Sequence, residues 1–148
     1  MFILALFALP ICISDWRYHR IPNIYLLFML YAIAVMHFFV GTRSITVIIA
    51  ATMFAILLSW LGMGAGDAKL FVIIALTLNL ASFGDLLLLA TSTYVATFVQ
   101  LVFTWRISRR LPKNLPLALP IFLGSALYLG ASMSTSLRQY ADALVNSW

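Results

Sequence analysis

Apolar residues fill most of this chain, and its polar residues gather in short clusters between long apolar runs. The runs are roughly 13 to 22 residues long, and a helix needs about 20 apolar residues to span a bilayer. The pattern predicts an all-α, polytopic membrane protein, a single membrane-embedded domain over residues 1–148 with about six transmembrane helices. The predicted spans are 2–16, 23–40, 45–61, 68–80, 86–105 and 115–133, followed by a short interfacial helix in the tail over 136–148.

The composition agrees with a chain that is solvated by lipid. Hydrophobic residues make up 64% of the 148 residues, above the roughly 45–50% that is usual in soluble domains. The single cysteine, Cys12, lies inside an apolar run, so it offers neither an intramolecular disulfide nor a zinc site of paired cysteines. We therefore expect no metal and no other cofactor.

Basic residues are distributed unequally between the turns that join the predicted helices. Seven of the nine lie in the turns after the first, third and fifth helices: Arg17, Arg20, Lys69, Arg106, Arg109, Arg110 and Lys113. The positive-inside rule then puts these turns in the cytoplasm and both chain termini outside. Topology accounts for the net charge of +5. No basic patch with interleaved aromatic residues points to a nucleic-acid partner.

Small and mildly polar residues mark helix faces that should pack within the bundle rather than contact substrate. One row of small residues lies on the third predicted helix: Ala51, Ala55 and Ser59. A mildly polar row lies on the fifth: Thr93, Thr97, Gln100 and Thr104. On the sixth helix, Ala126 and Gly130 form a packing pair. His37, near the outer end of the second helix, is expected to be structural.

The whole chain contains four carboxylates, Asp15, Asp67, Asp85 and Asp142. The predicted topology puts Asp15 and Asp67 on the same, cytoplasmic side. If the first and fourth helices pack together, these two would share one proton, because like charges a few Å apart resist joint ionisation. One carboxylate would then take a proton from water while the other, protonated, polarises the scissile carbonyl. This chemistry hydrolyses a peptide bond without a covalent intermediate.

Each aspartate also has a structural interpretation. Asp67 directly precedes a predicted helix, where an aspartate commonly caps the N terminus. Asp15 could instead pair with basic residues near it in the predicted bundle: Arg17, Arg20 or Lys69. From a different functional class, the two carboxylates could form the ion site of a small proton- or cation-coupled transporter, or belong to a pilus or secretion assembly subunit.

Two segments resemble the motifs of one enzyme family. The run Gly62-Met63-Gly64-Ala65-Gly66-Asp67-Ala68-Lys69-Leu70 looks like the Gly-x-Gly-Asp signature of type IV prepilin peptidases in its longer form. Asp15, followed six residues later by Ile21-Pro22-Asn23, resembles the other motif of that family. A looser likeness covers residues 116–124, which lack the usual central glycine of the last helix.

The resemblance implies that Asp15 and Asp67 are the catalytic pair of a membrane aspartic endopeptidase. Its substrates would be prepilins or pseudopilins, whose leader is removed at the cytoplasmic face of the bacterial inner membrane, in company with pilus or secretion machinery. Other motif residues would support this site: Pro22, Asn23, Gly64, Gly66 and Lys69. The two glycines would let a substrate strand approach the backbone, and Lys69 would hold a positive charge at the cytoplasmic end of its helix.

The size of the chain refines this expectation. The compact form looks like the minimal peptidases of tight-adherence (Flp-type) pilus systems. Longer members of the family carry an extra cytoplasmic region, often with paired cysteines, and also N-methylate the new amino terminus. This chain contains only Cys12, so we do not expect it to methylate its product.

Overall fold

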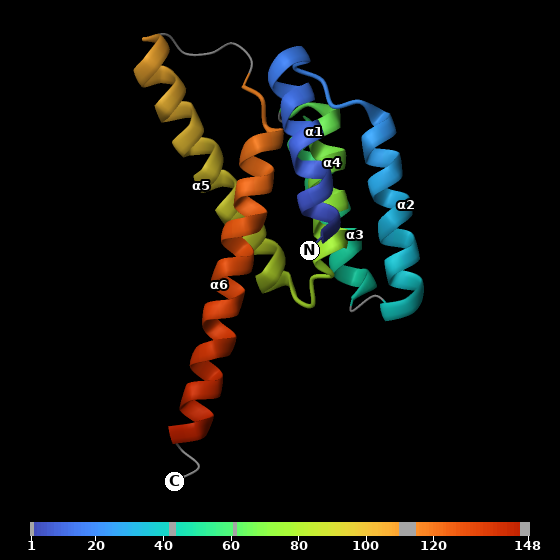
Figure 1. The fold of residues 1–148 in the computed structure, drawn as a ribbon, viewed down its shortest axis with the longest axis vertical. Coiled ribbons are helices and arrows are strands. Elements are labelled where there is room, and N and C mark those ends of the chain that lie inside the picture. The colour runs from blue at the N-terminus through green and yellow to red at the C-terminus, as the bar shows by residue number, and fades with distance from the viewer. Residues whose placement is uncertain (1, 42–43, 61, 110–114, 146–148) are drawn as a thin grey trace.

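The chain folds as a bundle of helices (Figure 1). The structure, a computed structural model, describes residues 2–41, 44–60, 62–109 and 115–145. Within these ranges it contains only helices, so the all-α prediction is confirmed. They are α1 (Phe2–Tyr18), α2 (Asn23–Val40), α3 (Ile45–Trp60), α4 (Ala65–Leu78), α5 (Phe83–Ser108) and α6 (Ala118–Val145).

Helix α4 is the centre of the bundle. It contacts α1, α2, α3 and α6, and it lies behind α1 in Figure 1. Its side chains are largely inaccessible, with Leu70 and Ile74 fully buried and Phe71 packed against Phe54 of α3. Helices α5 and α6 form a second unit that joins this centre mainly through α6. Because four helices surround α4, the position of its first turn is fixed from several sides.

Three helices start at a different residue from the predicted one, each for a local reason. Helix α4 starts three residues early, since Gly64 serves as its N-cap. Helix α5 starts at Phe83 because Ser82 and Asp85 form a capping box. Helix α6 starts at Ala118 rather than at residue 115. Residue 115 directly precedes Pro116, and a residue before a proline disfavours the helical conformation.

The end of α6 also differs from the prediction. We expected the sixth helix to stop near residue 133, with a separate interfacial helix in the tail. Instead α6 continues without a break to Val145, and its last part projects beyond the bundle (Figure 1). No proline or glycine interrupts the sequence after Gly130, so nothing local ends the helix there. Placement of the tail in the membrane interface stays a prediction, and residues 146–148 lie outside the described ranges.

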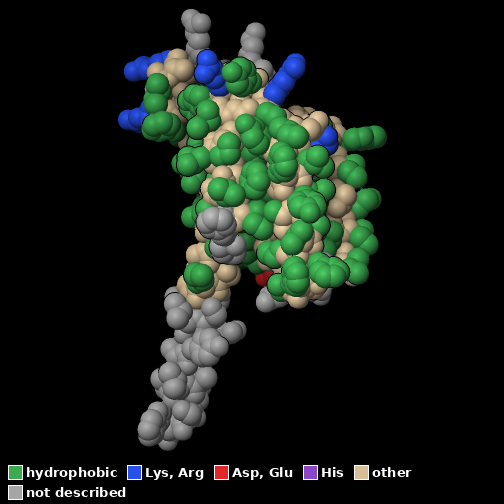
Figure 2. All heavy atoms as spheres, turned by 45° about the vertical axis from the view of Figure 1, so that its right-hand side comes forward, with side chains coloured by type: hydrophobic (Ala, Val, Ile, Leu, Met, Phe, Trp, Pro, Cys, Tyr) green, Lys and Arg blue, Asp and Glu red, His purple; other side chains and the backbone are tan. Residues whose placement is uncertain are grey.

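The outer surface of the bundle is apolar. Two of the described helices, Asn23–Val40 and Phe83–Ser108, are long and apolar enough to cross a membrane. Large side chains such as Phe38 and Trp60 are more than four-fifths exposed, and apolar atoms cover much of the face shown in Figure 2. Such a surface is suited to lipid rather than to water. The six-span topology and the outward orientation of both termini stay predictions.

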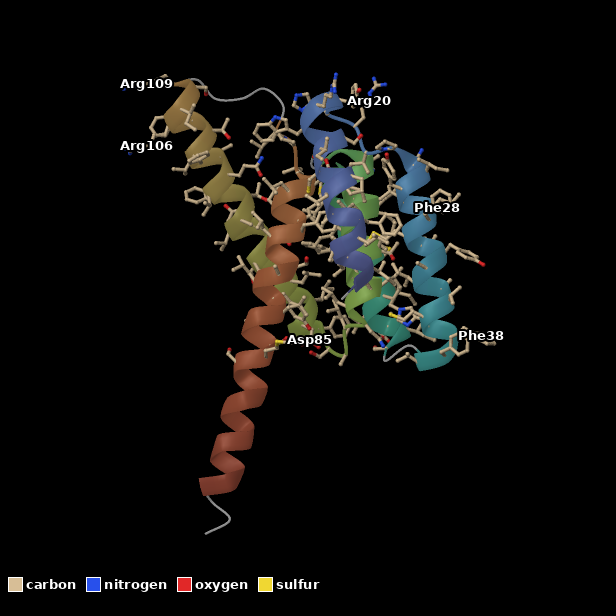
Figure 3. The ribbon with its side chains drawn as sticks, in the orientation of Figure 1. Arg20, Phe28, Phe38, Asp85, Arg106 and Arg109 are labelled. Carbon is tan, nitrogen blue, oxygen red and sulfur yellow. The ribbon has the colours of Figure 1, made fainter. Side chains whose placement is uncertain are left out.

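Charged residues separate between the two ends of the bundle. Arg20, Arg106 and Arg109 lie at one end, and Asp85 lies at the other (Figure 3). This is the separation that the alternating turns predict. Arg110 and Lys113 lie outside the described residues. At the Asp85 end, His37 joins two helices, because its ring nitrogens lie 2.9 Å from the Leu76 carbonyl oxygen and 3.2 Å from that of Gly41. His37 is therefore structural, as expected.

The predicted packing faces are correct on α3 and wrong on α6. Ala51 and Ala55 are buried. On α6, however, Ala126 is exposed and a methyl group on Gly130 would touch nothing. The close contact is at Gly124, two residues before Ala126, where an added Cβ would lie 2.5 Å from the Cα of Thr93. The spacing of two small residues does not say which face of the helix its neighbour covers.

Candidate active site

The turn between α3 and α4 holds Asp67 in place through its glycines. Gly62 has a φ of +103°, a left-handed backbone conformation that residues with side chains rarely adopt. Gly64, with a φ of −58° and a ψ of 138°, is the N-cap of α4. Asp67 is consequently the third residue of the helix, at the end of the bundle where α1 ends.

Asp67 is a half-buried carboxylate with incomplete hydrogen bonding. Its Oδ1 atom is buried and has no hydrogen-bond partner. Burial, and then the charge of Asp15, raise the pKa of the Asp67 carboxyl from 3.8 to about 7. Near neutral pH this carboxyl group therefore carries a proton for a large part of the time. Asp67 lies just ahead of the predicted span 68–80.

Asp15 lies on α1 and is only 4% exposed. Its Oδ2 atom accepts a hydrogen bond of 2.8 Å from the backbone N–H of Ala118, which is the first residue of α6. The first N–H groups of a helix have no partner within the helix, and the helix dipole favours negative charge at that end. The start of α6 thus supplies Asp15 with the donor that a buried carboxylate requires.

The two carboxylates form an electrostatically coupled pair. Helices α1 and α4 are in contact, and the charge of Asp15 acts on the carboxyl of Asp67. One member has a backbone donor, and the other has a buried oxygen without one. Two carboxylates in this relation can hold one proton between them, which is the protonation state needed by a hydrolase that uses one general base and one general acid.

The two motifs that the sequence singles out touch each other beside this pair. A Cβ on Gly66 would meet the Ile21 side chain at 3.5 Å, an ordinary contact. The Lys69 ammonium donates a hydrogen bond of 3.4 Å to the Asn23 side chain. Pro22 is the N-cap of α2, with a φ of −62°. The α1–α2 connection therefore packs on the first turn of α4.

Both structural interpretations of the aspartates can be compared with this geometry. Asp67 is not the N-cap of α4, because Gly64 holds that position. Asp85 shows what a capping carboxylate does: it is also the third residue of its helix, and its Oδ2 atom accepts from the backbone N–H groups of Ala81 and Ser82. Among the described residues, Asp15 has no basic side chain within ion-pair distance; its partner is the Ala118 N–H.

A groove opens next to the pair. It has a volume of about 570 Å³ and lies between α2 and α3, with α4 as its floor. Ala65, Ala68, Val72 and Leu76 line that floor, and the polar residues of the lining are Asn23, Thr52, Ser59 and Lys69. The groove thus runs along α4 from its first turn, which contains Asp67.

Sequence reasoning missed one partner of the site. The sequence does not reveal that the Ala118 N–H binds Asp15, because any residue other than proline at the start of α6 would supply a backbone N–H. The proline-containing segment that resembles the family's last helix could have drawn attention to this region. Among the described residues there is no cluster of three histidine, cysteine or acidic side chains that could hold a metal ion.

A comparison with known protein families gives one result. A model of the type IV leader peptidase family matches residues 2–104, which include both aspartates and both motifs. The chain belongs to the type IV leader peptidase family. It is a protease of the leader-peptidase type, and the membrane-embedded character of that family agrees with the apolar exterior of the bundle. Comparisons with curated proteins and with solved structures gave no match.

The environment of Gly64 in this leader peptidase yields a test that separates the site from the fold. A Cβ at Gly64 would lie 2.8 Å from Oδ2 of Asp67, so Gly64→Ala must displace the end of that flexible side chain. We expect leader cleavage to fall by about tenfold or more, since small misplacements of reacting groups are costly. Thermal unfolding in detergent should change little.

The matched control is Gly130→Ala, where an added methyl group meets nothing within 4 Å. It should leave both cleavage and unfolding as in the wild type. Full activity of a well-folded Gly64→Ala variant would show that the position of the Asp67 carboxylate does not depend on this glycine.

Proposed function

We propose that this leader peptidase is an aspartic endopeptidase in which Asp15 and Asp67 together activate a water molecule. One observation carries the proposal: a buried carboxylate held by a backbone N–H is electrostatically coupled to a second carboxyl group whose buried oxygen has no partner. Asp85, the equivalent helix residue at the other end, has two backbone donors on its Oδ2 atom.

The unequal environments of the two carboxyl groups suggest their roles. Asp15, with its N–H donor, acts as the base and takes a proton from water as the water oxygen attacks the scissile carbonyl carbon. Asp67, protonated near neutral pH, gives its proton to the carbonyl oxygen. When the tetrahedral intermediate collapses, Asp15 returns its proton to the leaving nitrogen and Asp67 recovers a proton from the hydroxyl group. Both residues end the cycle in their starting states.

The proposed substrates are type IV prepilins or pseudopilins, with the leader removed at the cytoplasmic face of the inner membrane. Support comes from the family description, which names a leader peptidase, and from the charge distribution. The described basic residues Arg20, Arg106 and Arg109 lie at one end of the bundle (Figure 3), the end at which α1 terminates and α4 and α6 begin. By the positive-inside rule, that end faces the cytoplasm.

The groove between α2 and α3 is the proposed seat for the apolar segment that follows the leader. Ala65 and Ala68 of its floor lie on either side of Asp67 in the chain, so a helix lying in the groove would bring its first residues close to the carboxyl pair. Small residues such as Ala55 and Ser59 in the wall allow close helix approach. The apolar lining suits a hydrophobic helix, and the polar end suits the point where that helix emerges from lipid.

The direct test of function replaces each carboxylate with its amide. We expect Asp15→Asn and Asp67→Asn each to lower kcat/KM for leader removal by about 10²- to 10⁴-fold, the usual contribution of a general acid or base. Each variant would be co-expressed with a panel of prepilins, and leader removal would be followed by gel shift and mass spectrometry. Membrane levels and unfolding of each variant would be measured in parallel.

Asp85→Asn is the matched control, because it changes an aspartate at the same helix position but at the opposite end of the bundle. It should weaken the cap of α5 and leave cleavage intact. Wild-type cleavage by a folded Asp15→Asn or Asp67→Asn variant would contradict the proposal. A wild type that carries an ion flux but cleaves no prepilin, with that flux lost in the Asp15 and Asp67 variants, would favour the transporter alternative.

A second prediction concerns the groove. Ile56 lines it, whereas Leu57, next in the chain and equally exposed at 54%, does not. Ile56→Phe should fill part of the groove and raise KM for a prepilin several-fold, with kcat changed less, because it weakens binding rather than chemistry. Leu57→Phe should leave both constants near wild type in steady-state assays. Equal effects of the two substitutions would show that the substrate does not use this groove.

A further inference from the structure

The donor for Asp15 lies at the junction between α6 and the segment that precedes it. Ala118 is the first residue of α6, and the segment before it, residues 115–117, is not helical. The Leu117 carbonyl, which shares one planar peptide unit with the Ala118 N–H, accepts a hydrogen bond of 3.1 Å from the Ile121 N–H. Helix α6 thus fixes one side of this peptide unit, and the other side is continuous with the non-helical segment, whose position depends on its own contacts.

One side chain of α5 makes that contact. The Gln100 Nε2 atom donates a hydrogen bond of 3.0 Å to the Pro116 carbonyl oxygen, two residues before Ala118. Pro116 has no N–H of its own, so its carbonyl is the only hydrogen-bonding group its backbone offers. A chain of two hydrogen bonds then leads from α5 to the carboxyl pair: Gln100 to the Pro116 carbonyl, and the Ala118 N–H to Asp15.

The other half of the Gln100 amide makes this contact informative. Its Oε1 atom is buried and has no hydrogen-bond partner. Turning the amide around would place two acceptor oxygens face to face, so the Pro116 carbonyl fixes its orientation. An unpaired buried acceptor costs free energy that an apolar side chain of similar size would not. Simple packing between helices would therefore be served better by leucine or methionine at this position.

We propose that Gln100 is a positioning residue for leader cleavage. By holding the Pro116 carbonyl, Gln100 fixes the segment ahead of α6 so that the Ala118 N–H stays on Oδ2 of Asp15. It acts through this segment and touches neither the substrate nor the reacting atoms. The consequence for cleavage rests on the proposed catalytic role of Asp15, whereas the link from Gln100 to the Ala118 N–H does not.

The test uses Gln100→Leu, with Gln100→Met as a second variant in case the branched side chain disturbs folding. The control is Thr104→Val, one turn further along α5, where the lost hydroxyl donates to the Gln100 backbone carbonyl within its own helix. Two quantities would be measured in the full-length protein: amide hydrogen exchange in a peptide covering residues 115–121, and kcat and KM for leader removal.

We expect faster exchange at residues 115–121 in both Gln100 variants, and a fall in kcat of about tenfold with KM nearly unchanged. A loss of overall packing would instead speed exchange throughout the bundle and lower the unfolding temperature. Thr104→Val should leave exchange at residues 115–121 and both kinetic constants as in the wild type.

The two measurements separate the failure of this inference from the failure of the proposed function. Unchanged exchange at residues 115–121 in a folded Gln100 variant would overturn the positioning role whatever the enzyme does. Faster exchange with wild-type kcat, in an enzyme that Asp15→Asn inactivates, would overturn the consequence for cleavage alone. Cleavage that survives Asp15→Asn would refute the proposed function and leave the exchange result to decide on the link from Gln100 to Ala118.

Discussion

The hydrogen bond from the Ala118 N–H to Asp15 is the interaction on which the site depends. A carboxylate that is 4% exposed needs a donor or a counter-charge, because burying it alone costs several kcal/mol. Here the donor comes from a residue 103 positions away in the chain, at the free N-terminal end of α6. The bond joins the first helix to the last and aims a helix N terminus at the carboxylate. The charge that is stabilised in this way then acts on Asp67, whose own buried oxygen has no partner.

The rest of the bundle fixes the positions of these two carboxyl groups relative to each other. Helix α4 carries Asp67 and is held by four neighbouring helices, while Gly64 leaves space beside the Asp67 carboxyl group. Across the molecule, α5 and α6 approach so closely that a methyl group on Gly124 would collide with the backbone of Thr93. Because α6 is fixed against α5 in this way, its N terminus has a defined position relative to α1. The apolar exterior is suited to lipid, and Asp15 is the one buried acidic side chain among the described residues.

Much of this architecture could be predicted from the sequence, because its signals are local. Apolar runs of helix length located all six helices, and the basic residues predicted which turns share one end. The motif and the predicted topology separate Asp67 from Asp85, although both follow a glycine and both are the third residue of a helix. The coupling of Asp67 to Asp15 depends on the packing of α1 against α4, which the sequence left open. The Ala118 donor, the contact from Gln100 to Pro116 and the true packing glycine of α6 likewise depend on which helix faces come together, which periodicity does not reveal.

If Asp15 and Asp67 share one proton, the protonation of the Asp67 carboxyl group must depend on Asp15. Infrared difference spectroscopy on the purified protein can follow the protonated carboxyl band as pH is raised, with Asp67→Asn identifying which part of the band belongs to Asp67. This band should disappear with a midpoint at about pH 7, and Asp15→Asn should move the midpoint lower because a neighbouring charge is removed. A midpoint near the ordinary value of about 4, unchanged by Asp15→Asn, would show that the two carboxyl groups are not coupled.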